Sequence, residues 1–183
     1  LGCTYLQFDD TALPCNCDTH ARQDVKARGE DADELTERYV RLINSCIHQM
    51  PAGMAVAIHL CRGNLKGAWM AEGGYEPIAD ALFNRLNVGT YCLEYDTERA
   101  GDFAPLRFVP KGKRVILGLV STKTPFLESK DVLKQRIDSA RTVLGPAVEG
   151  LSTADLIVGE DVVVTVSRLR YIKRSPLSED CAQ

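Results

Sequence analysis

The alternation of apolar runs with helical segments predicts an α/β protein, a partial (β/α)8 barrel of the TIM type with about four βα units. Short apolar runs alternate with amphipathic segments of ten or more residues, which is typical of parallel βαβ units. Polar and metal-ligating side chains follow these runs directly, as they do at the carboxyl ends of barrel strands. A complete barrel takes roughly 250 residues. The 183 residues therefore have room for about half of one.

The first unit begins with residues 3–8, a run of apolar, aromatic and β-branched residues that stops at Asp9 and Asp10. This pattern predicts a buried strand that ends at a polar rim. A polar stretch covers residues 18–33. Apolar residues then recur at spacings of three and four over residues 35–51, which predicts an amphipathic helix.

The second unit carries the most informative residues. Residues 54–58 form a continuous run of small apolar side chains, typical of a strand covered on both faces. His59 and Cys61 follow at its carboxyl end. A glycine-rich loop over residues 62–74 and a predicted helix over residues 75–86 complete the unit.

Two more units follow in the same order. Residues 90–93 are predicted as a strand, with Glu94 at its end. Residues 114–120 form the next predicted strand, followed by a loop over residues 121–127 and a helix over residues 129–144. We therefore assign residues 1–144 to the partial barrel.

The character of the chain changes after residue 144. Residues 145–160 resemble a loop, residues 162–166 a strand, and residues 173–183 a polar tail. We treat residues 145–183 as an atypical C-terminal segment. Because the chain starts with Leu1 rather than Met and enters its first predicted strand at once, we expect a truncated form whose missing barrel half, or an oligomer, would cover its exposed sheet.

Composition narrows the class of function. The charged fraction is 26% and the net charge is −3, so no basic surface is expected for nucleic acid or anionic lipid. No apolar run approaches the roughly 20 residues that cross a membrane, and the N-terminal residues lack a signal peptide pattern, so we expect a cytoplasmic protein. Seven scattered cysteines favour free or metal-bound thiols over disulfides.

His59, Cys61 and Glu94 are the candidate metal ligands. Two positions apart in an extended strand end, His59 and Cys61 point to the same side, and Glu94 would come from the neighbouring strand. Imidazole, thiolate and carboxylate are the groups that zinc prefers. A histidine and a cysteine that only pack in the core remain the alternative on residue types alone.

Four segments carry a family resemblance, namely residues 5–11, 59–64, 72–77 and 93–103. They resemble the C-terminal catalytic domain of the cobalamin-independent methionine synthase family, in particular its short bacterial and fungal relatives. The segments occur in the family's order and cover roughly residues 1–140.

The resemblance implies a zinc-dependent methyltransferase of methionine biosynthesis. It implies His59, Cys61 and Glu94 as ligands of a zinc ion that holds the homocysteine sulfur as a thiolate, which attacks the methyl group of methyltetrahydrofolate. It also implies that Asp9 meets the amino group of the amino-acid substrate. Arg62 follows Cys61 directly, and it is a candidate either for supporting the metal ligands through contacts behind them or for binding the substrate carboxylate.

Asn64, two residues after Arg62, is a second candidate for substrate binding.

The chain departs from the family's pattern at two places. Residues 145–180 contain no cysteine for a fourth zinc ligand, and Cys181 is a poor substitute. Lys123 stands where full-length synthases place a catalytic histidine, and it is a candidate proton donor.

Two other functions fit the same residues. The chain could be a non-catalytic fragment in which zinc only stabilises the fold or a partner interface. Metal-assisted hydrolysis would need a water in the open position and a base such as Asp9, Asp10 or Glu98.

Overall fold

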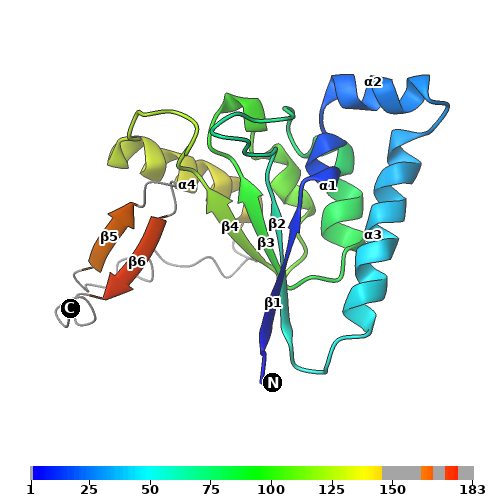
Figure 1. Ribbon diagram of the computed structural model, residues 1–183, viewed down its shortest axis with the longest axis horizontal. Helices are drawn as coiled ribbons and strands as arrows, with labels where there is room; N and C mark the ends of the chain where they lie inside the picture. Colours follow the sequence, from blue (N-terminus) through cyan, green and yellow to red (C-terminus); the bar gives the residue numbers. More distant parts are fainter. Residues whose placement is uncertain (1, 146–161, 167–171, 177–183) are drawn as a thin grey trace. The chain divides into compact units, whose positions relative to one another are not determined.

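The computed structural model describes residues 2–145 together with the backbone of two short strands, residues 162–166 and 172–176. The chain divides into two units, residues 1–150 and 151–183. The first unit is a mixed α/β structure around a four-stranded parallel sheet (Figure 1). Its strands lie in sequential order, β1 (Tyr5–Asp10), β2 (Ala55–Leu60), β3 (Thr90–Glu94) and β4 (Arg114–Gly118).

The connections between these strands are helical. They comprise α1 (Ala12–Cys15), α2 (Thr19–Ala27), α3 (Ala32–His48), the 3₁₀ turns Glu76–Ile78, Glu98–Ala100 and Ala104–Phe108, and the π-helical turn Ala81–Arg85. The helix α4 (Lys130–Leu144) follows β4. The side chains of Asp18, Asp31 and Ser129 accept hydrogen bonds from backbone N–H groups at the starts of α2, α3 and α4. Helical segments in the three crossovers agree with the predicted α/β class, although the crossover from β3 to β4 holds only 3₁₀ turns. Among the described residues, no helix has the length and apolar character to cross a membrane.

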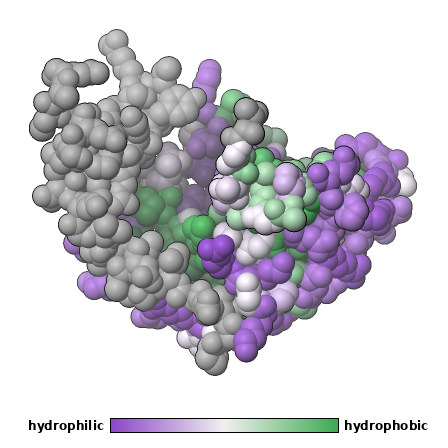
Figure 2. All heavy atoms as spheres, turned by 90° about the horizontal axis from the view of Figure 1, so that it is seen from below, coloured by the Kyte–Doolittle hydropathy of each residue, from purple (hydrophilic) through white to green (hydrophobic). Residues whose placement is uncertain are grey.

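The sheet buries one face under the helices. Parallel pairing sets Phe8 beside Ile58, Ile58 beside Tyr91 and Tyr91 beside Val115. These residues pack in one apolar cluster with the helical residues Val40, Ile43, Leu82 and Phe83. Seen from the amino ends of the strands, hydrophobic side chains gather towards the middle and hydrophilic ones lie at the outer rim (Figure 2).

The opposite face of the sheet is more open. Tyr5 on β1 and Ile116 on β4 point to this face, and they remain 50% and 46% exposed. No described residue pairs with the outer edge of β1 or of β4. Purely parallel sheets are normally covered on both faces. The open face is therefore the side of the sheet on which further structure or a ligand can pack.

Close backbone contacts join the loops that follow β2 and β3. Gly101 has φ +76°, and a Cβ built on it would lie 2.5 Å from the Cα of Gly74. Gly73 has φ +107°, and its Cβ would lie 2.3 Å from the carbonyl oxygen of Cys17. Only glycine satisfies both the backbone angle and the space at these positions.

Several boundaries differ from prediction. β1 begins and ends two residues later than the predicted strand, so Asp9 and Asp10 lie within it. His59 lies within β2, whereas Cys61 follows its end. The stretch 18–33 was predicted as merely polar but contains α2, which buries only Val25 and therefore has little apolar signal.

The C-terminal unit contains one described feature. β5 (Val162–Val166) pairs antiparallel with β6 (Ile172–Pro176). The predicted strand at residues 162–166 is present. The predicted polar tail at residues 173–183 is wrong at its start, because most of β6 lies there and backbone pairing does not require an apolar run. The predicted loop over residues 145–160 lies, from residue 146 on, outside the described residues.

Candidate metal centre

A row of side chains crosses the open face near the carboxyl ends of the strands. Strand register places Asp9 beside His59, His59 beside Cys92, and Cys92 beside Ile116. All four side chains point to the same face, because paired residues in a sheet share an orientation. Cys61 follows β2 two positions beyond His59 and lies above this row.

Three of these residues form a group that could hold a metal ion. The ligand atoms of Asp9, His59 and Cys61 lie within 4.8 Å of one another. The Oδ1 atom of Asp9 lies 2.6 Å from Nδ1 of His59, so the carboxylate fixes the imidazole and leaves Nε2 free. Nitrogen, sulfur and carboxylate oxygen are the donor set that zinc uses, and the residues therefore fit this ion chemically.

The thiol of Cys61 sits in an environment that favours its protonated form. Burial raises its pKa, and the nearby carboxylates of Glu94 and Asp9 raise it further, although the backbone N–H of Gly63 and the charge of Lys123 lower it. A divalent cation reverses this preference, because it stabilises the thiolate directly. The thiol is thus suited to release its proton when a cation binds.

A cavity of about 260 Å³ opens beside the group. His59, Cys61 and Cys92 line it on the metal side, while Ile116 and Val120 provide an apolar wall. Its size suits a small molecule rather than a macromolecule.

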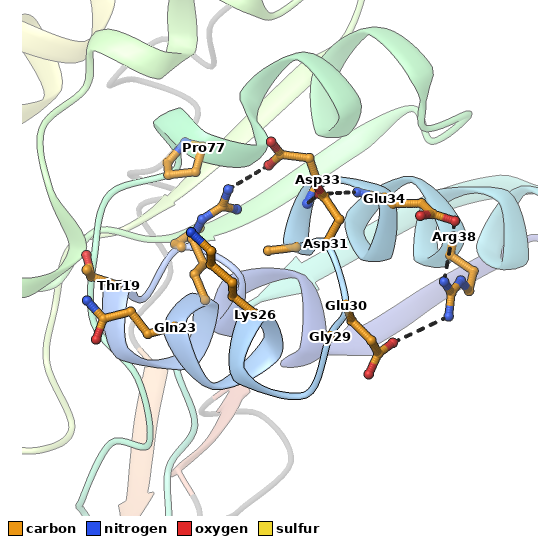
Figure 3. A pocket seen from close by; sticks show the side chains of 13 residues that line it. Thr19, Gln23, Lys26, Gly29, Glu30, Asp31, Asp33, Glu34, Arg38 and Pro77 are labelled. Atoms are coloured by element: carbon orange, nitrogen blue, oxygen red, sulfur yellow. Dashed lines mark hydrogen bonds and ion pairs between the residues drawn. The ribbon is translucent and has the colours of Figure 1, made fainter.

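A larger groove of about 880 Å³ lies between α2 and the start of α3 (Figure 3). Its charged side chains pair with one another, as Arg22 does with Asp33 at 2.7 Å and Arg38 with Glu30 at 3.7 Å. None of the metal-ligating group lines it, so we place the site at the smaller cavity.

Glu94, the third predicted ligand, is not in the group of ligand atoms. Its Oε2 accepts the backbone N–H of Arg62 at 2.5 Å, and its Oε1 pairs with Arg99 and, at 3.0 Å, with Nζ of Lys123. Burial raises the pKa of Glu94, but these donors outweigh it and the net pKa lies below the ordinary value. Glu94 is therefore an engaged carboxylate at the cavity wall.

Asp96 completes a buried charge cluster with Glu94, Arg99 and Lys123. The Asp96 carboxylate accepts the hydroxyl of Ser121 at 2.9 Å, and it lies 3.3 Å from Arg99 and 3.5 Å from Lys123. Its side chain is 3% exposed. Two carboxylates and two cations make the cluster electrically neutral. Sequence reasoning missed Asp96, although its place two residues beyond Glu94 at the same strand end was a usable signal.

Arg62 does not fit its predicted role in binding a substrate carboxylate, because it is completely buried. Its guanidinium donates to the carbonyls of Gly73, Glu94 and Ala100 and to the hydroxyl of Tyr75, at 2.5–3.3 Å. These contacts use its five N–H donors. Arg62 also stacks on the Tyr75 ring at 4.3 Å. The residue holds the loops behind the site together.

Asn64 lines the cavity and joins two loops at its mouth. Its amide donates to the hydroxyl of Thr122 at 3.1 Å, and its carbonyl oxygen accepts the N–H of Gly67 at 3.1 Å. Asp10 points away from the site, since its carboxylate accepts the N–H of Leu13 at the start of α1. Asp9, His59, Cys61, Asn64 and Lys123 thus gather around the cavity or its rim, whereas Asp10 does not.

Comparison with known proteins gives two relatives. No protein-family model and no solved structure matches the chain. The uncharacterized protein YxjG of Bacillus subtilis (strain 168) is 41% identical over 140 residues, and the uncharacterized protein YxjH of the same organism is 38% identical over 140 residues. Each alignment covers 76% of this chain and 37% of the relative. The chain thus spans little more than a third of the length of these curated relatives.

Proposed function

We propose that this chain is the metal-binding part of a (β/α)8 barrel that transfers a methyl group to a thiol, as the resemblance to methionine synthases implies. The observation that carries the proposal is the convergence of Asp9, His59 and Cys61 at the carboxyl ends of neighbouring parallel strands. Active sites of (β/α) barrels lie at this end of the sheet. The cavity beside the group gives a thiol access to the ion.

Zinc at this position would stabilise the thiolate of the acceptor, homocysteine by the resemblance, and so supply the nucleophile. Residues of this chain would orient the metal ligand and line the cavity that the acceptor enters. Asp9 orients His59, and its second oxygen is free to accept a substrate ammonium group. The neutral cluster around Glu94 and Asp96 forms a polar wall, and Ile116 gives an apolar one.

The transfer needs a proton donor as well as a nucleophile. The sulfur–carbon bond forms as the carbon–nitrogen bond of the donor, methyltetrahydrofolate by the resemblance, breaks, and the released nitrogen takes up a proton. Lys123 is the cation whose Nζ lies at the cavity, held 3.0 Å from Glu94. We assign it the role of supplying that proton.

Other strands would have to complete the barrel. In this proposal the four parallel strands with one open face would form half of an eight-stranded barrel, and the relatives extend well beyond the matched region. The remaining half, in a longer chain or in a partner copy, would add most of the surface for the methyl donor.

A non-catalytic zinc-binding fragment is the second candidate function. It is favoured by the engagement of Glu94 with Arg99 and Lys123, which removes one expected ligand from the group. In that case zinc would bind and stabilise the sheet without turnover.

The test measures zinc and methyl transfer in the same preparations. We expect close to one zinc per chain in the wild type, little in Cys61→Ser, and the wild-type amount in Cys46→Ser, whose thiol is exposed on α3. Methionine formation from homocysteine and methyltetrahydrofolate would support the enzyme, and zinc without turnover would support the fragment. A folded wild type without zinc would refute both.

A further inference from the structure

β3 presents two metal-ligating side chains to the open face, Cys92 and Glu94. Glu94 is already bound by Arg62, Arg99 and Lys123. The thiol of Cys92 has one weak contact, 3.9 Å to Oε1 of Gln7. Of the two side chains, Cys92 is therefore the one that can turn to a ligand at little cost.

Cys92 also lies beside the metal-ligating group. It is the register partner of His59 on the neighbouring strand, and it lines the same cavity as His59 and Cys61. The register partner of Gln7 on β2 is Ala57, which carries only a methyl group on this face of the sheet. Rotation about one Cα–Cβ bond changes the direction of the sulfur between staggered positions.

We propose that Cys92 is a ligand of the metal, so that Nε2 of His59 and the sulfurs of Cys61 and Cys92 hold the ion. Asp9 then acts through His59 as a positioning residue, because its carboxylate occupies Nδ1 at 2.6 Å. This inference rests on the proposed function only in placing a metal at this cavity. It replaces Glu94 by a thiolate from the same strand.

The ligand set defines the class of ion. Two thiolates and an imidazole select a thiophilic ion such as Zn²⁺, Co²⁺ or Cd²⁺ over Mg²⁺ and Ca²⁺, which take oxygen ligands. Three protein ligands leave a fourth tetrahedral position open. A thiol or a water molecule from the cavity that these residues line could fill it.

Cobalt substitution counts the thiolates directly. Co²⁺ bound to the wild-type chain should show thiolate-to-cobalt charge-transfer absorption from two sulfurs, and Cys92→Ser should lose about half of its intensity at saturating cobalt. Cys46→Ser, which changes an exposed thiol on α3, should match the wild type. Asp9→Asn should weaken binding by about 10-fold to 100-fold and keep the full intensity, as expected for a residue that acts through a ligand.

The outcomes separate this inference from the proposed function. Unchanged intensity and affinity in Cys92→Ser, with cobalt still bound, would overturn the role of Cys92 and leave the metal site intact. No cobalt in a folded wild type would overturn both.

A second measurement avoids substitutions that could disturb the fold. Bound zinc should protect Cys61 and Cys92 of the wild type from alkylation by iodoacetamide, with the sites read by mass spectrometry. Cys46 should react equally with and without zinc. Protection of Cys61 alone would refute the proposal for Cys92.

Discussion

Replacing Arg62 with methionine should destabilise the fold strongly. The side chain is completely buried, and its guanidinium donates to the carbonyls of Gly73, Glu94 and Ala100. Methionine fills a similar volume but has no donor. The loops on either side of the cavity would therefore lose the side chain that joins them.

The size of the loss follows from the acceptors left behind. A buried polar group without a partner costs about 1–3 kcal/mol. The carbonyl of Glu94 keeps a share of the Tyr75 hydroxyl at 3.3 Å, whose proton also points to the carbonyl of Leu60 at 3.0 Å. The carbonyls of Gly73 and Ala100 lose their guanidinium donors. Two orphaned carbonyls cost about 2–6 kcal/mol. The lost stacking on Tyr75 adds about 1–2 kcal/mol, which gives a total of about 3–8 kcal/mol.

Urea unfolding followed by far-UV circular dichroism measures this loss. Arg107→Met is the matched control, since Arg107 is an exposed arginine that pairs with Glu76 and stacks on Phe108. Its midpoint should move little. An Arg62→Met protein as stable as the wild type, but with weakened binding of a thiol amino acid, would refute the structural role and restore the role in substrate binding.

Three further predictions concern stability. Burial raises the pKa values of Glu94 and Asp96, but their hydrogen-bond donors and neighbouring cations lower both below the ordinary values. The folded state therefore binds fewer protons than the unfolded state. The free energy of unfolding should be constant above about pH 5 and should fall as the pH drops through about 4 and below. Asp96→Asn should flatten this fall, and an unchanged slope in urea titrations at several pH values would contradict the assignment. Gly101→Ala should lower the free energy of unfolding clearly more than Gly112→Ala. Both glycines have positive φ, but only at Gly101 would a Cβ meet a facing backbone. Equal shifts of the urea midpoint would contradict that contact. Asp18→Ala should lower the free energy of unfolding by about 1–2 kcal/mol in the same assay. The Asp18 carboxylate accepts two N–H groups of α2 and a third from the loop after β2. A much smaller loss would show that water replaces the cap.

The sequence predicted the parallel units because apolar runs and helices alternate, and this local pattern does not depend on long-range contacts. It also placed His59 and Cys61 on one side, since side chains alternate along a strand. The neighbour of His59 on β3 depends on register, which the turns and packing decide. Cys92 was therefore not predicted to lie beside it.

Charged residues were the main source of error at the site. Because Arg62 follows Cys61 directly, substrate binding was one of the two roles expected for it. The structure buries it instead, because loops from two connections supply carbonyl acceptors on several sides. The engagement of Glu94 depends in the same way on Lys123, which is distant in sequence. Such contacts cannot be inferred from spacing.

The row that runs from Asp9 through His59 to Cys92 has a thermodynamic consequence for the sheet. These side chains come from three neighbouring strands, so an ion held by His59 and Cys92 and buttressed by Asp9 would cross-link the strands. A slip of one residue in either pairing would turn a ligand to the other face and release the ion. Free zinc at 100 times its dissociation constant would add about 2.7 kcal/mol to the free energy of unfolding. A chelator would then lower the urea midpoint of the whole domain.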